Sequence, residues 1–134
     1  MRKALPVLLM VSFGSCTVAP APFANVQGGQ ARLAQMLAGK IAGRPQSCIP
    51  SYVASNLEVI DPTTFAYRDG SRIYVNQVQG ACHGAQTPGY TLVMHPFGFG
   101  GPCQNDVVRV TELSTGMVAG SCILGPFVPY TNAR

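Results

Sequence analysis

An Asp69-Gly70 pair lies between two runs of β-branched and aromatic residues, within residues 63–78. Such a pair is a strong hairpin signal, because a type I′ turn needs positive φ, which glycine adopts without steric cost. We predict a β-hairpin with the two-residue loop Asp69-Gly70, in which Arg68 faces Ser71. This register pairs Phe65 with Tyr74, Tyr67 with Arg72 and Thr63 with Asn76 on one face. The other face carries Thr64, Ala66, Ile73 and Val75, so we expect both faces to be covered.

Four further segments have the alternation or the apolar content of short strands: residues 57–60, 90–95, 106–113 and 117–124. The 134 residues, of which 47% are hydrophobic and 10% charged, suffice for one domain with a core. The 15 glycines and 11 prolines indicate many turns. We predict a mainly β domain over residues 44–130, a small antiparallel sheet or partly closed barrel of five to six short strands, with one short N-terminal helix and two disulfides.

The predicted helix covers residues 30–43. Leu33, Met36, Leu37 and Ile41 recur there at helical spacing, and Gly43 is placed to end the helix. Its polar side carries only two basic residues, so we expect an amphipathic helix packed on the sheet rather than one lying on a membrane.

The N-terminus has the pattern of an export signal over residues 1–15. Arg2 and Lys3 precede an apolar stretch over residues 4–13, which is much shorter than a membrane-spanning helix. The segment Phe13-Gly14-Ser15-Cys16 resembles a bacterial lipobox, in which small residues precede a cysteine that is lipidated. We therefore predict lipidation of Cys16. Residues 16–29 are small, proline-rich and uncharged, as expected of a lipid-anchored tether.

These features predict export and anchoring at the periplasmic face of the outer membrane, since Thr17 rather than aspartate follows Cys16. A soluble periplasmic or secreted protein is the alternative. Removal of Arg2 and Lys3 leaves 7 basic and 5 acidic residues, a net charge near +2. Because the remaining basic residues are scattered, no nucleic-acid partner is predicted.

Five cysteines leave an even set of four once Cys16 is assigned to lipid. An even set suits disulfides in an oxidising compartment. We predict Cys48–Cys122, which brackets the β region, and Cys82–Cys103, which joins two glycine-rich strand ends. A zinc site is the alternative, but zinc ligands usually come in close C-x2-C pairs, and none occurs here. No metal or cofactor is therefore predicted.

Several short motifs lie around the four domain cysteines. They are Arg44-Pro45, Cys48-Ile49-Pro50, Arg72 to Asn76 before Cys82, Asp106 to Val110 after Cys103, Gly120-Ser121-Cys122, Leu124-Gly125 and Phe127 to Tyr130. With this spacing the chain resembles a family of small exported proteins of Gram-negative bacteria of unknown function. The resemblance covers residues 44–130 and implies an envelope location and disulfides, but it supplies no catalytic residues.

Few residues suggest catalysis. His83 lies in a glycine-rich turn and His95 ends a strand, positions typical of polar surface residues. Ser121 lacks the second glycine of a nucleophile elbow, and the spacing of the five carboxylates suggests no acid–base pair. No catalytic residue is predicted.

One segment, Pro96-Phe97-Gly98-Phe99-Gly100-Gly101-Pro102, has the composition of a binding loop, with two aromatic residues among glycines. The alternative is a wide turn whose Phe97 and Phe99 fold back over the core. We therefore expect an envelope lipoprotein that acts as a binding or structural module. Its predicted partners are the membrane, through the N-terminal lipid, and an envelope protein. A small periplasmic hydrolase and an inhibitor of a cell-wall enzyme are the alternatives.

Overall fold

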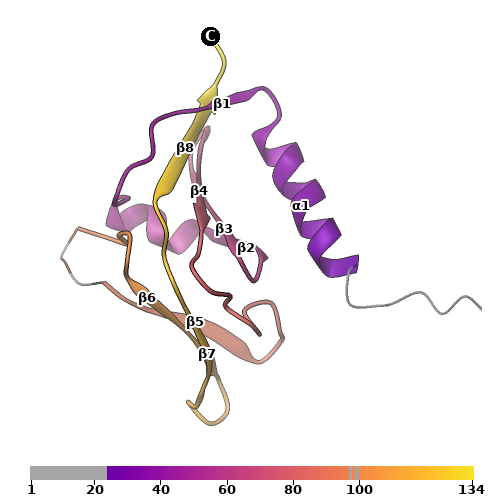
Figure 1. The fold of residues 1–134 in the computed structure, drawn as a ribbon, viewed down its shortest axis with the longest axis vertical. Helices are drawn as coiled ribbons and strands as arrows, with labels where there is room; N and C mark the ends of the chain where they lie inside the picture. Colours follow the sequence, from indigo (N-terminus) through magenta and orange to yellow (C-terminus); the bar gives the residue numbers. More distant parts are fainter. Residues whose placement is uncertain (1–23, 97, 99) are drawn as a thin grey trace, which may run out of the picture.

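Two antiparallel sheets, one α-helix and one 3₁₀ helix make up the part of the chain that the computed structural model describes, which is residues 24–96, 98 and 100–134 (Figure 1). The elements are α1 (Ala24–Leu37), β1 (Lys40–Ala42), η2 (Ser51–Asn56), β2 (Leu57–Asp61), β3 (Thr64–Asp69), β4 (Arg72–Gln77), β5 (Tyr90–His95), β6 (Val107–Glu112), β7 (Val118–Ile123) and β8 (Phe127–Asn132). The predicted mainly β fold with one short helix is confirmed.

The predicted hairpin is confirmed as β3 and β4, but its predicted register is wrong. Asp69 pairs with Arg72, so the two-residue loop is Gly70-Ser71. Gly70 has φ 58° and Ser71 does not have positive φ, the sign pattern of a type II′ turn, which favours glycine at the first loop position. The observed pairs are Phe65 with Asn76, Ala66 with Val75 and Tyr67 with Tyr74. Because the register is shifted by an even number of residues, every side chain stays on its predicted face.

The five-stranded sheet has the order β1-β8-β4-β3-β2, and α1 covers one of its faces (Figure 1). Leu33 of α1 packs there in a cluster with Ile60, Ala66, Ile73 and Val75. Alternate residues of β3 and β4 point to the opposite face, so the hairpin is covered on both sides, as predicted.

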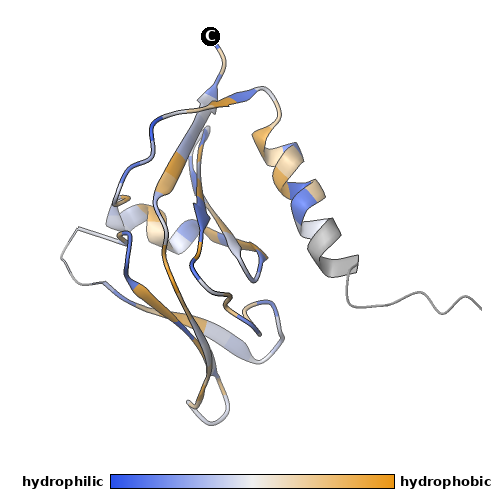
Figure 2. Cartoon of the chain, in the orientation of Figure 1, coloured by the Kyte–Doolittle hydropathy of each residue, from blue (hydrophilic) through white to orange (hydrophobic). Residues whose placement is uncertain are grey.

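The opposite face packs against η2 and the three-stranded sheet β5-β6-β7. Phe65 and Tyr67 of β3 meet Val108 and Val110 of β6 in this larger core. The Tyr67 ring also meets the Phe127 ring edge-on, with 5.7 Å between centroids. Figure 2 shows strongly hydrophobic stretches within β6 and β8. The three layers therefore enclose two cores, one on each face of the five-stranded sheet.

The predicted bounds of the helix are wrong, because α1 covers Ala24–Leu37 rather than residues 30–43. Gly39, with φ 70°, follows the last helical turn, and the chain then continues as β1 beside β8. Residues 24–29 are accordingly helical rather than part of a tether. The predicted signal at 1–15, Cys16 and the rest of the tether up to residue 23 lie outside the described residues.

The described chain has eight strands rather than five or six, and its two sheets form no closed barrel. The additional strands are β1 and β8. The proline at position 129 argues against a central strand, because proline cannot donate a ladder hydrogen bond. In β8, however, the Pro129 carbonyl accepts from the Gly43 amide at 2.7 Å, so the proline nitrogen also faces that side. The regular pairing of β1 with β8 ends at Ala42, one residue before the position opposite Pro129.

Two disulfides are present, Cys48–Cys103 and Cys82–Cys122, and the predicted pairs Cys48–Cys122 and Cys82–Cys103 are wrong. Cys48 and Cys103 lie opposite each other in an isolated antiparallel bridge. Backbone hydrogen bonds on either side of this bridge hold the two segments together: the Ile49 amide donates to the Pro102 carbonyl at 3.0 Å and the Gln104 amide to the Ser47 carbonyl at 2.6 Å. The Gln79–Ile123 bridge brings the segment after β4 beside β7, next to Cys122. Contacts between sequence-distant segments thus decide the pairing.

Candidate functional site

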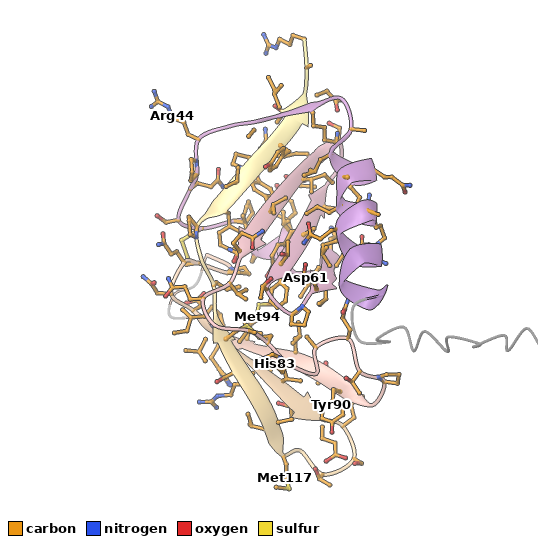
Figure 3. The ribbon with its side chains drawn as sticks, turned by 45° about the vertical axis from the view of Figure 1, so that its right-hand side comes forward. Arg44, Asp61, His83, Tyr90, Met94 and Met117 are labelled. Carbon is orange, nitrogen blue, oxygen red and sulfur yellow. A yellow bond between two sulfur atoms is a disulfide. The ribbon has the colours of Figure 1, made fainter. Side chains whose placement is uncertain are left out.

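A cavity of about 300 Å³ lies between η2, the end of β5 and the segment that precedes Cys103. Its described lining residues are Ser51, Ala54, Met94, Pro96, Gly98, Gly101 and Pro102. Figure 3 shows Met94 between the two sheets. These residues come from three regions of the sequence, which the fold brings to one place.

The wall formed by Gly101 and Pro102 is fixed tightly against the start of η2. Gly101 has φ 114°, and a Cβ there would overlap the Ile49 carbonyl oxygen and approach the Ser51 amide nitrogen to 2.6 Å. A side chain at Gly101 is therefore excluded both by backbone conformation and by space. The Cys48–Cys103 disulfide ties the same two segments together. The opening between η2 and residues 101–102 is consequently set by glycine packing and by a covalent bond.

Behind the cavity, Met94 contacts a buried tyrosine. The Tyr67 hydroxyl donates a hydrogen bond to Met94 Sδ at 3.8 Å, and Tyr67 itself is fully buried. Burial, together with the negative charge of Asp106, raises the pKa of Tyr67 well above its ordinary value. Tyr67 therefore stays neutral and holds the side chain of Met94 at the cavity lining.

The lining favours an uncharged, apolar ligand. Among the lining residues that the structure describes, none carries a charge, and Ser51 contributes the hydroxyl group. The volume lies at the lower end of the range for small-molecule sites, which are mostly apolar with a few polar groups. A charged ligand would lose its hydration without gaining a partner of opposite charge from these residues.

The predicted binding-loop residues Phe97 and Phe99 lie outside the described residues. Their neighbours Pro96 and Gly98 line the cavity. Sequence reasoning missed Ser51, Ala54 and Met94. No local signal marks them, because their shared position depends on how η2 packs against the end of β5.

The structure does not bring the two histidines to the buried aspartates. His95 pairs with Val107, and it lies on the outer face of the three-stranded sheet because its neighbour Met94 points into the core. Asp106 is 1% exposed, and its Oδ2 accepts the Cys103 amide at 2.7 Å. His83 is exposed in the connection between β4 and β5. Figure 3 shows it apart from Asp61.

Asp61 has a structural role at the turn between β2 and β3. Its Oδ1 accepts hydrogen bonds from the amide and hydroxyl of Thr63, both at 2.8 Å, and its Oδ2 accepts one from the Gln30 side chain. Burial alone raises the pKa of Asp61, but these hydrogen bonds outweigh burial and hold it below its ordinary value. Asp61 thus stays ionised and bound to its neighbours.

Within residues 24–96, 98 and 100–134, no group of three or more histidine, cysteine, aspartate or glutamate residues is arranged to hold a metal ion. In the same residues, no helix combines the length and the apolar character needed to cross a membrane. Comparison with protein-family models, with curated proteins and with solved structures finds no match to this chain. The resemblance to exported Gram-negative proteins stays a prediction.

Proposed function

We propose that this protein is an exported binding module that takes a neutral apolar ligand in the cavity between η2 and β5, and that a lipid on Cys16 anchors it at the cell envelope. The disulfides support export, because such bonds persist in oxidising compartments outside the cytoplasm. Anchoring is supported by the lipobox-like segment that ends in Cys16.

The observation that carries the binding function is the cavity itself. It combines an apolar lining with a wall fixed by Gly101 and by the Cys48–Cys103 bond. A pre-formed site loses less conformational entropy on binding than a flexible one does. An apolar cavity with one fixed wall therefore favours reversible binding of an apolar group, in contrast to the convergent polar groups that a hydrolase needs.

Titration with N-phenyl-1-naphthylamine, a neutral fluorescent probe, tests the site. The variant Ala54→Leu fills the cavity from η2, so we expect the Kd of the probe to rise about tenfold or more, equivalent to about 1.4 kcal/mol. Medium-chain primary alcohols are expected to displace the probe, and fatty-acid anions of equal length to displace it less well, because the lining offers no positive charge.

The matched control is Ala34→Leu, the same change at an exposed position on α1. This variant is expected to bind the probe like the unaltered chain. Equal probe binding by the unaltered chain and by folded Ala54→Leu would contradict the assignment of the cavity. Folding of both variants is checked by their thermal unfolding.

Anchoring is tested separately by metabolic labelling with a fatty acid. The unaltered chain is expected to take up label and Cys16→Ala to lose it. The control Ser15→Ala, a small-residue change next to the cysteine, is expected to keep the label. Equal labelling of the unaltered chain and Cys16→Ala would end the anchoring part of the proposal and leave the binding part to its own test.

A further inference from the structure

Exposed apolar side chains cluster at the turn between β6 and β7. Leu113 is 67% exposed, Met117 68% and Val118 55%. The other large hydrophobic residues that are exposed in the described chain, Ile41, Tyr52 and Ile123, come from three separate elements. Figure 3 shows Met117 at one extreme of the molecule. We call residues 112–118 the apolar tip.

Three backbone amides of the apolar tip donate hydrogen bonds within the protein. The Glu112 amide donates to the Met117 carbonyl at 2.9 Å, and the Gly116 amide donates to the Glu112 carbonyl at 2.8 Å. The Leu113 amide reaches the Gly89 carbonyl at 2.8 Å. These three donors do not depend on water. A segment that enters an apolar medium needs this property, because each unpaired polar group costs free energy there.

The two hydroxyl groups of the tip are exposed, but both are hydrogen-bonded within the tip. Ser114 Oγ and Thr115 Oγ1 donate to the two carboxylate oxygens of Glu112, at 3.0 and 2.7 Å, and Thr115 Oγ1 accepts the Met117 amide at 3.2 Å. A turn with two hydroxyl residues would ordinarily present them to solvent. Here both hydroxyl groups are bound to Glu112, and the side chains of Leu113, Met117 and Val118 are exposed beside them.

We propose that the apolar tip inserts into the outer layer of a phospholipid membrane as a second, non-covalent contact. The inference rests on the proposed envelope location, and the chain ends agree with it. The N-terminal end of α1 is the end nearer the tip, whereas the C-terminus lies at the opposite pole (Figure 1). Ala24 follows Cys16 by eight residues, which span at most about 28 Å. A lipid on Cys16 would therefore hold the half of the molecule that contains the apolar tip near the membrane.

The charges near the tip limit the depth of insertion. Glu112, at the base of the turn, is ionised and stays among the headgroups. Arg109 is exposed on β6 three residues earlier, about 10 Å further from the tip. Insertion by 5 to 10 Å is typical of interfacial segments and leaves Arg109 level with the phosphates. The partner is thus the headgroup and acyl boundary of a bilayer rather than its centre.

The absence of tryptophan from the sequence makes a local test possible, since one substitution introduces a single fluorescent reporter. In full-length Cys16→Ala, Met117→Trp places the reporter at the tip. The matched control, Ile41→Trp, places it at a similarly exposed site, 58% exposed, on β1. The vesicles consist of phosphatidylethanolamine and phosphatidylglycerol, with and without bromine on the acyl chains.

We expect vesicles to shift the emission of Met117→Trp to shorter wavelength and brominated chains to quench it, with neither effect for Ile41→Trp. In the Cys16→Ala protein, which carries no covalent lipid, the double substitution Leu113→Ser and Met117→Ser is expected to weaken partitioning into vesicles about tenfold or more, because two apolar side chains lose their burial in lipid. Ile41→Ser is expected to leave partitioning unchanged.

No lipid-dependent shift in Met117→Trp, or equal shifts at both positions, would overturn the inference. A shift without lipid that grows with protein concentration would indicate self-association through the tip and would overturn it as well. The readout is separable from the proposed function. The vesicle experiment does not depend on fatty-acid labelling of Cys16. Failure of the tip to insert would likewise not contradict lipidation of Cys16 or binding of the probe in the cavity.

Discussion

Buried polar side chains form hydrogen bonds with the backbone at the connections between strands. Asn76 of β4 is fully buried, and its side chain donates to the Gly125 carbonyl at 2.7 Å and accepts the Gly125 amide at 3.0 Å. This pair fixes the connection from β7 to β8, and so it joins the two sheets. In the described residues, every buried side-chain nitrogen or oxygen has a hydrogen-bond partner. The hydrogen bonds of these buried polar side chains therefore help to stabilise the fold.

At the residue scale, Asp61→Asn is expected to lower the free energy of unfolding by about 1–2 kcal/mol near neutral pH, because hydrogen bonds to the carboxylate are lost or weakened. The folded-state pKa of Asp61 lies below its ordinary value of 3.8. Its contribution is thus present above that value and is lost as pH falls through the folded pKa. Urea unfolding from neutral pH into acid is expected to show a difference that shrinks as the pH falls below 3.8 and through the folded pKa.

The control for Asp61→Asn is Asp69→Asn, which removes the same charge at the end of β3. This variant is expected to change stability less near neutral pH. A difference between Asp61→Asn and the unaltered chain that stays constant from neutral pH into acid would contradict a role for the ionised carboxylate.

At the scale of elements, a glycine decides how closely α1 approaches β2. A Cβ at Gly29 would overlap the Ile60 carbonyl oxygen, whereas a Cβ at the preceding Gly28 has no neighbour within 4 Å. Arg32 reaches across the same contact to Glu58, with 2.6 Å between Nε and Oε1, but this exposed ion pair adds little stability. The close helix–strand approach therefore depends mainly on Gly29 and on the packing of Leu33.

The two adjacent glycines provide a matched pair of variants. Gly28→Ala is expected to raise the free energy of unfolding by about 0.5–1 kcal/mol, because alanine favours the helix. Gly29→Ala gains the same propensity but pushes α1 away from β2, so a net loss of about 1–3 kcal/mol is expected. Chemical denaturation measures both. Equal stabilisation by the two substitutions would show that α1 does not pack closely at Gly29.

At the scale of the whole molecule, two interlaced disulfides tie the sheets together and differ in accessibility. Cys82 and Cys122 are 0% and 3% exposed within the larger core, whereas Cys48 is exposed and Cys103 is half-exposed beside the cavity. Their sequence separations of 55 and 40 residues correspond, in the chain-entropy model, to about 4 kcal/mol each. Both are large against a typical total stability of about 5–15 kcal/mol.

Mild reduction of the folded protein followed by alkylation is expected to modify Cys48 and Cys103 first, because a reductant must reach the sulfur atoms. Cys82 and Cys122 are expected to react only when the domain unfolds. Peptide mapping identifies the modified cysteines, and mapping without reductant gives the pairs. Modification of Cys82 and Cys122 ahead of Cys48 and Cys103, or a peptide that joins Cys48 to Cys122, would contradict this arrangement.

The sequence by itself determined the short-range features of this protein. It located the hairpin and the two faces of its strands, because side-chain alternation and turn chemistry act over a few residues. It also gave the bounds of β5 as residues 90–95, between a Pro-Gly pair and a proline. An amphipathic helix near the N-terminus was also predictable, but the spacing of its apolar residues showed neither its start at Ala24 nor that Gly39 rather than Gly43 would follow its end.

Only the tertiary structure decided which distant segments meet. The Pro129 strand finds its place between β1 and β4 because the proline nitrogen faces the point where β1 has ended. The cysteine pairs follow from backbone bridges between segments 40 or more residues apart. The cavity arises where η2, the end of β5 and Gly101 converge. Such contacts depend on how the two sheets pack against each other. The turn residues and alternating side chains of one short stretch do not encode that packing.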